Sequence, residues 1–263
     1  LFVSDWYDPG VGGHGMGDVD RGRIFRVAPP NTPYKVPTFD FATAAGAVDA
    51  LKNPNLAVRY LAWTALHEMG EKAEPALVEM FEESDNPRLR ARAFFVLAKM
   101  DGTGQRYIDL ASTDDNPHFR IAALRAARQS GNDVMPFVDR LAKDPNPQVR
   151  RECAIALRPL DKKQSSEAWA ELAAQHDGSD RWYLEALGIG ADGKWNEYLD
   201  AWLHKVGDQW NTPAGRDILW RSRGDKTASY LARIINDPST SAEELPRYLR
   251  AFDFLTQDQR DQA

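Results

Sequence analysis

Cysteine is almost absent from this sequence of 263 residues, which contains only Cys153. One thiol cannot form a disulfide within the chain. It also cannot supply a Cys-x-x-Cys metal site or a Cys-x-x-Cys-His haem attachment. These three kinds of cysteine chemistry are therefore excluded for this chain by itself, whereas the redox compartment in which the protein works is left open.

Long apolar runs and an excess of positive charge are also missing. The uninterrupted apolar stretches are short, such as residues 93–98, whereas a helix that crosses a membrane needs about 18 apolar residues. Lysine and arginine total 33 against 39 aspartate and glutamate, which gives a net charge of −6. A chain with this charge has no general attraction for nucleic acid or anionic lipid. Its hydrophobic content of 43% still predicts a folded core.

The first 27 residues differ in composition from the rest of the chain. Two β-rich runs, residues 2–7 and 23–27, flank a glycine-rich stretch, and this pattern predicts a β-hairpin with a long loop. An isolated hairpin is only marginally stable in water, so we expect it to belong to a larger sheet outside this chain or to pack on helices. Four prolines between residues 28 and 38 predict an extended linker, which we place at residues 28–42.

From about residue 43 onward the sequence is helical and repetitive. Four Asn-Pro pairs recur, with their prolines 33, 30 and 30 residues apart, at residues 53–54, 86–87, 116–117 and 146–147. Asparagine caps helix N-termini, and proline is favoured at the first helical residue because its missing N–H would have no partner there. Each pair is therefore predicted to begin a helix. Further starts are expected at residues 180–181, 212–213 and 241–242, with Pro246 as an alternative first residue for the last helix.

The four helices that follow these pairs align on their prolines. Positions two, six and nine after each proline share one side of a helix and are expected to be buried. The columns are Leu56, Leu89, Phe119 and Val149; Tyr60, Ala93, Ala123 and Cys153; and Trp63, Val96, Ala126 and Ala156. Shorter amphipathic helices lie between them. Because a unit of two helices in about 30 residues cannot bury its apolar side alone, stacked units are predicted.

The fourth of these units resembles the second half of a HEAT repeat. In that family pattern an aspartate lies between the two helices, and an arginine follows a valine near the start of the second helix, as Asp144, Val149 and Arg150 do here. The resemblance implies an all-α fold. We expect a HEAT-like, right-handed α-α superhelix of about seven helical pairs over residues 43–263.

Two more units match the same pattern, with Arg90 and Arg120 in the arginine position, whereas the first unit has Ala57 there. The resemblance implies that aspartates form a ladder of charge-assisted hydrogen bonds with these arginines between successive units. The expected ladder residues are Asp85, Asp115 and Asp144.

Longer strings resemble large planctomycete-type membrane-bound dehydrogenases with a haem-binding domain. Residues 2–14 and 21–27 look like the last blade of the propeller in those proteins, and residues 59–70, 181–188 and 210–217 are similar to segments that follow it. The resemblance implies a sugar-dehydrogenase-like propeller before this chain and a c-type haem domain after it, in a periplasmic or secreted protein. Because the chain starts within a predicted strand, we expect residues 1–27 to be the remnant of that blade.

No catalytic site can be assembled from the sequence. Residues 10–15 fit Gly-x-Gly-x-x-Gly, but a second strand follows instead of the helix that a dinucleotide site needs. The same loop offers weak candidates for a cation or cofactor site, against the simpler interpretation of a plain loop: His14, Asp18 and Asp20. His67 falls on the predicted buried stripe, where a packed histidine is expected. Cys153 is expected to be a buried, inert thiol.

Arginines repeat on the predicted second helices. In solenoids of this type the second helices line the concave surface, so a stripe of guanidinium groups there would suit an acidic partner. The candidates are Arg90, Arg120, Arg125, Arg128, Arg150 and Arg158. A solvated surface with ladder bonds is the alternative. Six of the eight tryptophans lie between residues 169 and 220, where core packing and the docking of a neighbouring domain both stay open.

These observations predict a non-catalytic scaffold with no cofactor of its own, which links the propeller to the haem domain. The expected partners are those flanking domains or another protein, and we expect neither nucleic-acid binding nor membrane insertion. A self-standing protein-interaction module is one alternative. A HEAT-like DNA glycosylase is a weaker one, because only the arginine stripe supports it and the net charge opposes it.

Overall fold

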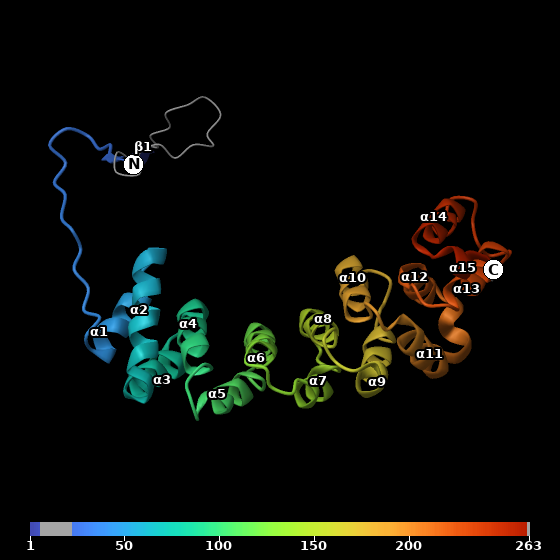
Figure 1. The fold of residues 1–263 in the computed structure, drawn as a ribbon, viewed down its shortest axis with the longest axis horizontal. Coiled ribbons are helices and arrows are strands. Elements are labelled where there is room, and N and C mark those ends of the chain that lie inside the picture. Colours follow the sequence, from blue (N-terminus) through green and yellow to red (C-terminus); the bar gives the residue numbers. More distant parts are fainter. Residues whose placement is uncertain (6–22, 262–263) are drawn as a thin grey trace. The chain divides into compact units, whose positions relative to one another are not determined.

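The computed structural model describes residues 1–5 and 23–261. The chain divides into two compact units, Leu1–Asp40 and Phe41–Ala263 (Figure 1). The two units are described separately below. The loop that carries His14, Asp18 and Asp20 lies outside the described residues.

The first unit contains the predicted hairpin. Strands β1 (Phe2–Asp5) and β2 (Arg23–Arg26) pair in antiparallel register, with Phe2 opposite Arg26 and Val3 opposite Phe25. Every residue of β2 is exposed within this chain. Residues 27–40, all of them described, form neither helix nor strand, as the prolines in this segment predict.

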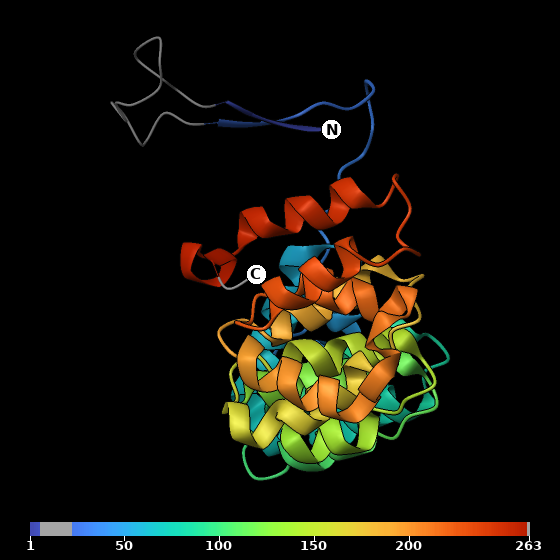
Figure 2. The ribbon, with the colours of Figure 1, turned by 90° about the vertical axis from the view of Figure 1, so that its right-hand side faces the viewer.

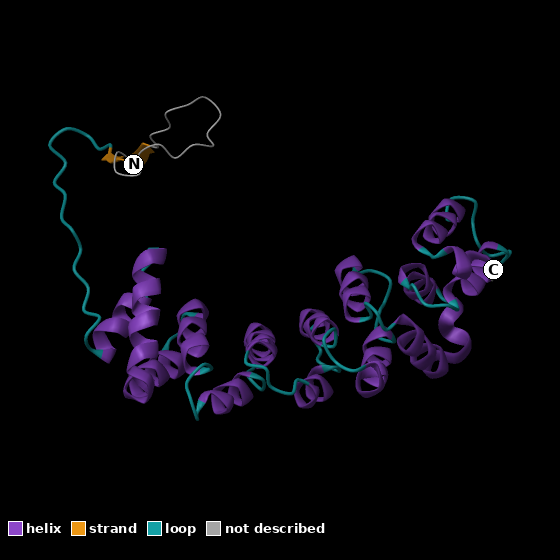
Figure 3. Ribbon diagram, viewed as in Figure 1, coloured by secondary structure: helices purple, strands orange, loops and turns teal. Residues whose placement is uncertain are grey.

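The second unit is helical, and short loops connect its helices (Figure 3). The described residues form seven successive pairs and a final short helix, α15 (Gln257–Asp261), in agreement with the sequence prediction. The pairs are α1 (Ala44–Leu51) and α2 (Leu56–Met69), α3 (Glu74–Glu83) and α4 (Pro87–Leu97), α5 (Gly104–Ala111) and α6 (Pro117–Gln129), α7 (Met135–Leu141) and α8 (Pro147–Ala156), α9 (Lys162–Ala173) and α10 (Arg181–Gly190), α11 (Trp195–Val206) and α12 (Pro213–Arg221), and α13 (Thr227–Ile235) and α14 (Leu245–Ala251). Short 3₁₀ turns follow α2, α11 and α14, at Gly70–Ala73, Gly207–Asn211 and Phe252–Phe254.

Within this unit the helices form two layers. Helices α3, α5, α7, α9 and α11 lie on the outer side of a curved row, and α4, α6, α8, α10 and α12 lie on its inner side (Figure 1). Viewed along the row, the pairs stack behind one another (Figure 2). Successive helices of one layer pack together, for example α6 with α8, α8 with α10, and α9 with α11. We call α2, α4, α6, α8, α10 and α12 the second-helix layer.

Three of the four Asn-Pro pairs begin helices as predicted. The side-chain oxygens of Asn86, Asn116 and Asn146 accept hydrogen bonds from the second helical N–H, at 3.0, 3.0 and 2.8 Å, and a proline is the first helical residue in each case. Asp180 and Thr212 cap α10 and α12, and each accepts from the third helical N–H, at 3.1 and 3.2 Å. The start predicted at residues 241–242 is wrong, because those residues lie outside helix α14, which begins at Leu245 with Pro246 second.

The first Asn-Pro pair does not begin a helix. Asn55 caps α2 by accepting from the Ala57 N–H at 2.9 Å, and Asn53 instead accepts from the Asn55 N–H at 2.8 Å. The residue two positions before the cap has the same role in later units, where Asp144 accepts from the N–H of Asn146. The correct alignment of the first unit is therefore shifted by two residues from the one based on proline.

This shift corrects several predictions for α2. Leu56 and Tyr60, expected in the core, are 72% and 66% exposed, and the buried column is formed by Val58, Ala62 and Leu66 instead. The arginine position of the first unit holds Arg59 rather than Ala57.

His67 is likewise exposed, and its ring stacks on Trp63 with 5.2 Å between centroids. The expectation that His67 is packed in the core is therefore wrong.

Elsewhere the predicted core is buried. Phe119 of α6 and Val149 of α8 are buried, Val149 with no exposed surface, whereas Leu89 of α4 is only half-buried. Leu77, Met80 and Phe81 of α3 and Phe137, Val138 and Leu141 of α7 are buried as their spacing predicts. Cys153 is fully buried, and this burial raises the pKa of its thiol, so the thiol stays protonated and unreactive at neutral pH.

Candidate functional site

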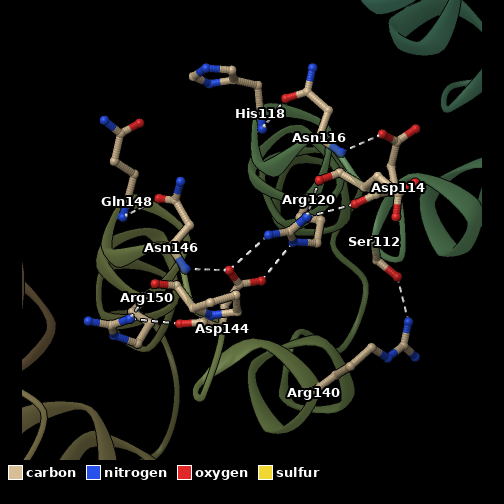
Figure 4. Close-up of polar contacts among 12 residues, drawn as sticks. Ser112, Asp114, Asn116, His118, Arg120, Arg140, Asp144, Asn146, Gln148 and Arg150 are labelled. Carbon is tan, nitrogen blue, oxygen red and sulfur yellow. Dashed lines mark hydrogen bonds and ion pairs between the residues drawn. The ribbon is translucent and has the colours of Figure 1, made fainter.

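The most regular polar feature of the second unit is a ladder of arginine side chains between successive pairs. Arg120, four residues after its helix cap, donates through Nε and Nη2 to the two carboxylate oxygens of Asp144 at 2.7 and 2.9 Å. Its Nη1 donates to the backbone carbonyls of Asp114 and Asp115 (Figure 4). The Asp144 carboxylate also accepts from the N–H of Asn146 at 2.9 Å. One buried aspartate therefore joins two units and organises the loop that begins the next helix.

The preceding rung uses a different aspartate from the expected one. Arg90 donates through Nη2 to Asp114 at 2.7 Å and through Nε to the Phe81 carbonyl at 2.9 Å. Asp115, predicted for this role, is exposed and offers Arg120 only its backbone carbonyl. The aspartate that bonds to the arginine lies two residues before the cap, because only there does its carboxylate also reach the cap N–H. Asp85 lies one residue before its cap and is exposed, so it forms no rung in the described structure.

The ladder has gaps at both ends. Two residues before the cap of α10 stands Gly178, so Arg150 has no carboxylate there and donates to the Asp144 carbonyl at 2.7 Å while lying over the Tyr183 ring. At the other end, Arg59 faces a unit in which Ser84 holds the aspartate position.

A related rung returns near the C-terminal end of the array. Arg216, four residues after the Thr212 cap, donates to Asp237 at 3.0 Å, and Asp237 accepts from the N–H of Ser239.

The six arginines predicted as a partner surface therefore divide into two groups. Arg90, Arg120 and Arg150 are partly buried and make the inter-unit contacts described above, so they do not form a free guanidinium stripe. Arg125 and Arg128 share one buried carboxylate, that of Glu152, at 2.7 and 3.9 Å. Arg158 pairs with Asp192 at 2.9 Å, and both side chains are mostly exposed. Two guanidinium groups on one carboxylate leave an excess positive charge on α6.

Exposed apolar side chains also lie on the second-helix layer. Trp182 of α10 is 70% exposed, and Ile189 of the same helix and Tyr60 of α2 are also exposed. By contrast Trp169, Trp195, Trp202 and Trp210 are buried, and the Trp169 indole donates to the Leu187 carbonyl at 2.9 Å. The tryptophan cluster is thus largely core, with Trp182 as an exposed member.

A buried lysine that sequence reasoning did not identify fixes the end of α8. The Lys194 ammonium donates to the carbonyls of Leu157, Arg158 and Leu160 at 2.6, 3.0 and 3.2 Å. These carbonyls lie at a helix C-terminus, where a positive charge is favourable. Burial lowers the pKa of Lys194. The sequence contains no local signal for this contact, because the lysine is more than thirty residues away from its partners.

A buried histidine and a partly buried aspartate connect three units near the C-terminal end. His176 Nε2 lies 3.1 Å from Asp217 Oδ2, and Arg247 donates to Asp217 Oδ1 at 2.6 Å. Burial opposes ionisation of Asp217, but the hydrogen bonds from His176 and Arg247 outweigh it and hold the pKa of that carboxyl below its usual value. No nucleophile accompanies this pair among the contacts of the described residues, so the arrangement connects units rather than forming a catalytic triad.

The lowered pKa of Asp217 predicts an acid-dependent loss of stability. Because the folded pKa is below the unfolded one, the stabilisation is present above about pH 4 and is lost as pH falls through the folded pKa. We expect Asp217→Asn to lower the free energy of unfolding at pH 7 and to weaken its fall between about pH 4 and pH 2. Urea unfolding followed by circular dichroism at several pH values measures both effects. Asp139→Asn, at an exposed residue of α7, is the control, and an equal change in that variant would contradict the prediction.

Residues 1–5 and 23–261 contain no cluster of three or more histidine, cysteine, aspartate or glutamate side chains that would suit a metal ion. In the same part of the chain, no helix has the length and apolar character required to span a bilayer.

The repeat geometry agrees with a comparison against known families. Residues 104–188 match the family model of HEAT repeats. This segment runs from α5 to α10 and contains the Arg120–Asp144 rung. The search of curated proteins found no match. Residues 104–188 are thus similar to HEAT repeats, and they lie within a longer all-α array of stacked helical pairs.

Proposed function

We propose that the second unit is a non-catalytic scaffold that binds another protein along its second-helix layer. The observation that carries this proposal is the difference between the two faces of those helices. One face supplies the buried columns and the ladder, and the other leaves Tyr60, Trp182 and Ile189 exposed together with Arg125 and Arg158. Exposed aromatic and arginine side chains on a rigid array are typical of protein-binding surfaces.

The partners that the sequence favours are a sugar-dehydrogenase-like propeller and a c-type haem domain in the same longer protein. This part of the proposal is supported by the resemblance of residues 2–27, 59–70, 181–188 and 210–217 to membrane-bound dehydrogenases. In this arrangement the array holds the two domains at a fixed spacing and needs no cofactor of its own. The resemblance also favours a periplasmic or secreted location. A self-standing interaction module would use the same surface for an unrelated protein.

The test uses the propeller and haem domains that this proposal assigns to the same longer protein, each expressed separately and titrated with the full chain. We expect at least one of them to bind with a Kd in the micromolar range. Trp182→Ala should weaken that binding by about thirtyfold, corresponding to the loss of an aromatic anchor. Leu110→Ala, at an exposed residue of the outer helix α5, is the control and should leave the Kd unchanged.

Two results would contradict the proposal. The assignment of these two partners fails if neither domain binds, and the binding role of the second-helix layer fails if Leu110→Ala and Trp182→Ala weaken binding equally. The non-catalytic role fails if the chain by itself oxidises a sugar in the presence of an artificial electron acceptor.

A further inference from the structure

The first rung of the ladder lacks its anion. Arg59 holds the ladder position of the first unit, and the residue two positions before the next cap is Ser84 rather than aspartate. No hydrogen bond or ion pair joins the Arg59 side chain to another residue in the described part of the chain, and its Nε is buried without a partner. In the equivalent position Arg120 directs Nε at a carboxylate. Arg59 is therefore a ladder arginine whose side-chain donors bond to no other residue among those that the structure describes.

Two arginines of α4 lie close to Arg59. Arg92 donates through Nη1 to the carbonyls of Leu51 and Asn53 at 2.9 and 3.4 Å, which places it against the loop before α2. Burial lowers the pKa of Arg92, and the charges of Arg59 and Arg88 lower it further. Arg92 thus lies near enough to both Arg59 and Arg88 to be repelled by them, and none of the three pairs with a carboxylate of residues 1–5 or 23–261.

The surroundings of this cluster are also cationic. Helices α4, α6 and α8 contain eight arginines and a single carboxylate, Glu152, although the whole chain carries a net charge of −6. A fourth cation, Lys99, lies over the Trp63 ring at 5.5 Å and connects the region after α4 with α2. By contrast α3, in the outer layer, contains four glutamates and no cation. Five of these eight arginines pair with carboxylates: Arg90 with Asp114, Arg120 with Asp144, Arg125 and Arg128 with Glu152, and Arg151 with Asp180. The unpaired positive charge of α4 is therefore that of Arg88 and Arg92.

Guanidinium groups that lie close together without carboxylate partners favour a bound oxyanion. Like charges destabilise one another, and an anion between them would remove the repulsion and accept the unused donors. A carboxylate suits the position because the same repeat places one against the equivalent arginines, in Asp114 and Asp144. Guanidinium groups bind carboxylates through two parallel hydrogen bonds, which gives such contacts direction as well as charge.

We propose that Arg59, Arg88 and Arg92 form a carboxylate-binding site at which an acidic segment of a partner protein docks. This inference rests on the proposed scaffold function and specifies the chemistry of its partner. The bound segment supplies from outside the carboxylate that Ser84 does not supply from within the chain. Because Arg125 and Arg128 of α6 share one carboxylate and add excess positive charge to the same layer, an extended acidic segment is matched better than a single free anion.

The probe is a fluorescein-labelled peptide of eight glutamates, titrated with the full chain and followed by fluorescence anisotropy at low salt. Octaglutamine with the same label is the uncharged control. We expect octaglutamate to bind and octaglutamine not to bind. Arg59→Gln and Arg88→Gln should each weaken the binding of octaglutamate by about threefold, and together by about tenfold. The side chain of Arg88 has no partner in the described structure, so Arg88→Gln should fold normally.

Arg106→Gln is the matched control, since Arg106 is an exposed residue of α5 in the outer layer and its replacement removes the same charge. It should leave the affinity for octaglutamate unchanged. Equal weakening by Arg106→Gln and Arg88→Gln would overturn the proposal. So would tighter binding of a 20-base-pair duplex that depends on the same arginines, because the ligand would then be a nucleic acid.

The titrations with the propeller and haem domains separate this inference from the proposed function. If those domains bind but octaglutamate binding does not depend on Arg59 and Arg88, the scaffold stands and the acidic-segment site fails. If octaglutamate binding depends on the two arginines but neither domain binds, the site stands and the assigned partners fail.

Discussion

The Asp144→Ala variant is expected to lose about 3–5 kcal/mol of the free energy of unfolding. The Asp144 side chain is almost fully buried and accepts two hydrogen bonds from Arg120 and one from the N–H of Asn146. Its removal leaves a mostly buried guanidinium group without its counter-ion and frees the loop that begins α8. Because neighbouring units of a solenoid support one another, the loss should lower the stability of the whole array. Urea unfolding followed by circular dichroism measures it.

Asp115→Ala is the matched control for Asp144→Ala. Asp115 lies in the equivalent loop of the preceding unit, but its side chain is exposed and Arg120 contacts only its carbonyl, so we expect a change below about 0.5 kcal/mol. The double variant Arg120→Ala/Asp144→Ala should cost less than the sum of the two single variants, because each single change leaves the other partner unpaired. Additive effects, or an equal loss from Asp115→Ala, would show that the ladder is not organised around Asp144.

The helices of the array were predictable because their starts and apolar columns are local features. Asn86, Asn116 and Asn146 each supply a cap followed by proline, and the residues that follow have the spacing of one helix side. The start of the first unit was predicted wrongly because Asn53-Pro54 repeats the dipeptide, although the residue that caps the helix is Asn55. The decisive signal was the polar side chain two residues before the cap, which Asn53 itself provides for Asn55. Alignment on that residue would have placed Arg59 in its column.

The polar contacts between units were less predictable, because a local pattern does not show which residue each side chain reaches. The choice of Asp114 over Asp115 depends on whether a carboxylate faces both the cap N–H and the arginine of the preceding unit. Lys194 and His176 contact partners more than thirty residues away, through the stacking of units rather than through sequence spacing. The unpaired state of Arg59 is visible only when the neighbouring unit is in place.

Close approach between helices was also hidden from sequence analysis. Two glycines occur two residues apart in α10, and from sequence alone each would be expected to destabilise the helix. In the structure Gly190 packs against the backbone of α8, where an added Cβ would collide with the carbonyl oxygen of Ala154. For an added Cβ at Gly188, the three nearest atoms all belong to the guanidinium end of Arg221.

These two environments predict opposite outcomes for the same substitution. Gly190→Ala should destabilise the array by about 2–3 kcal/mol, because α8 and α10 must move apart and the gain in helix propensity does not offset the lost packing. Gly188→Ala should change the free energy of unfolding by less than about 1 kcal/mol, since the flexible Arg221 side chain can move and the helix gains about as much as it loses. Thermal and urea unfolding of both variants measure the difference. Equal effects would mean that the contact between α8 and α10 is not backbone to backbone at Gly190.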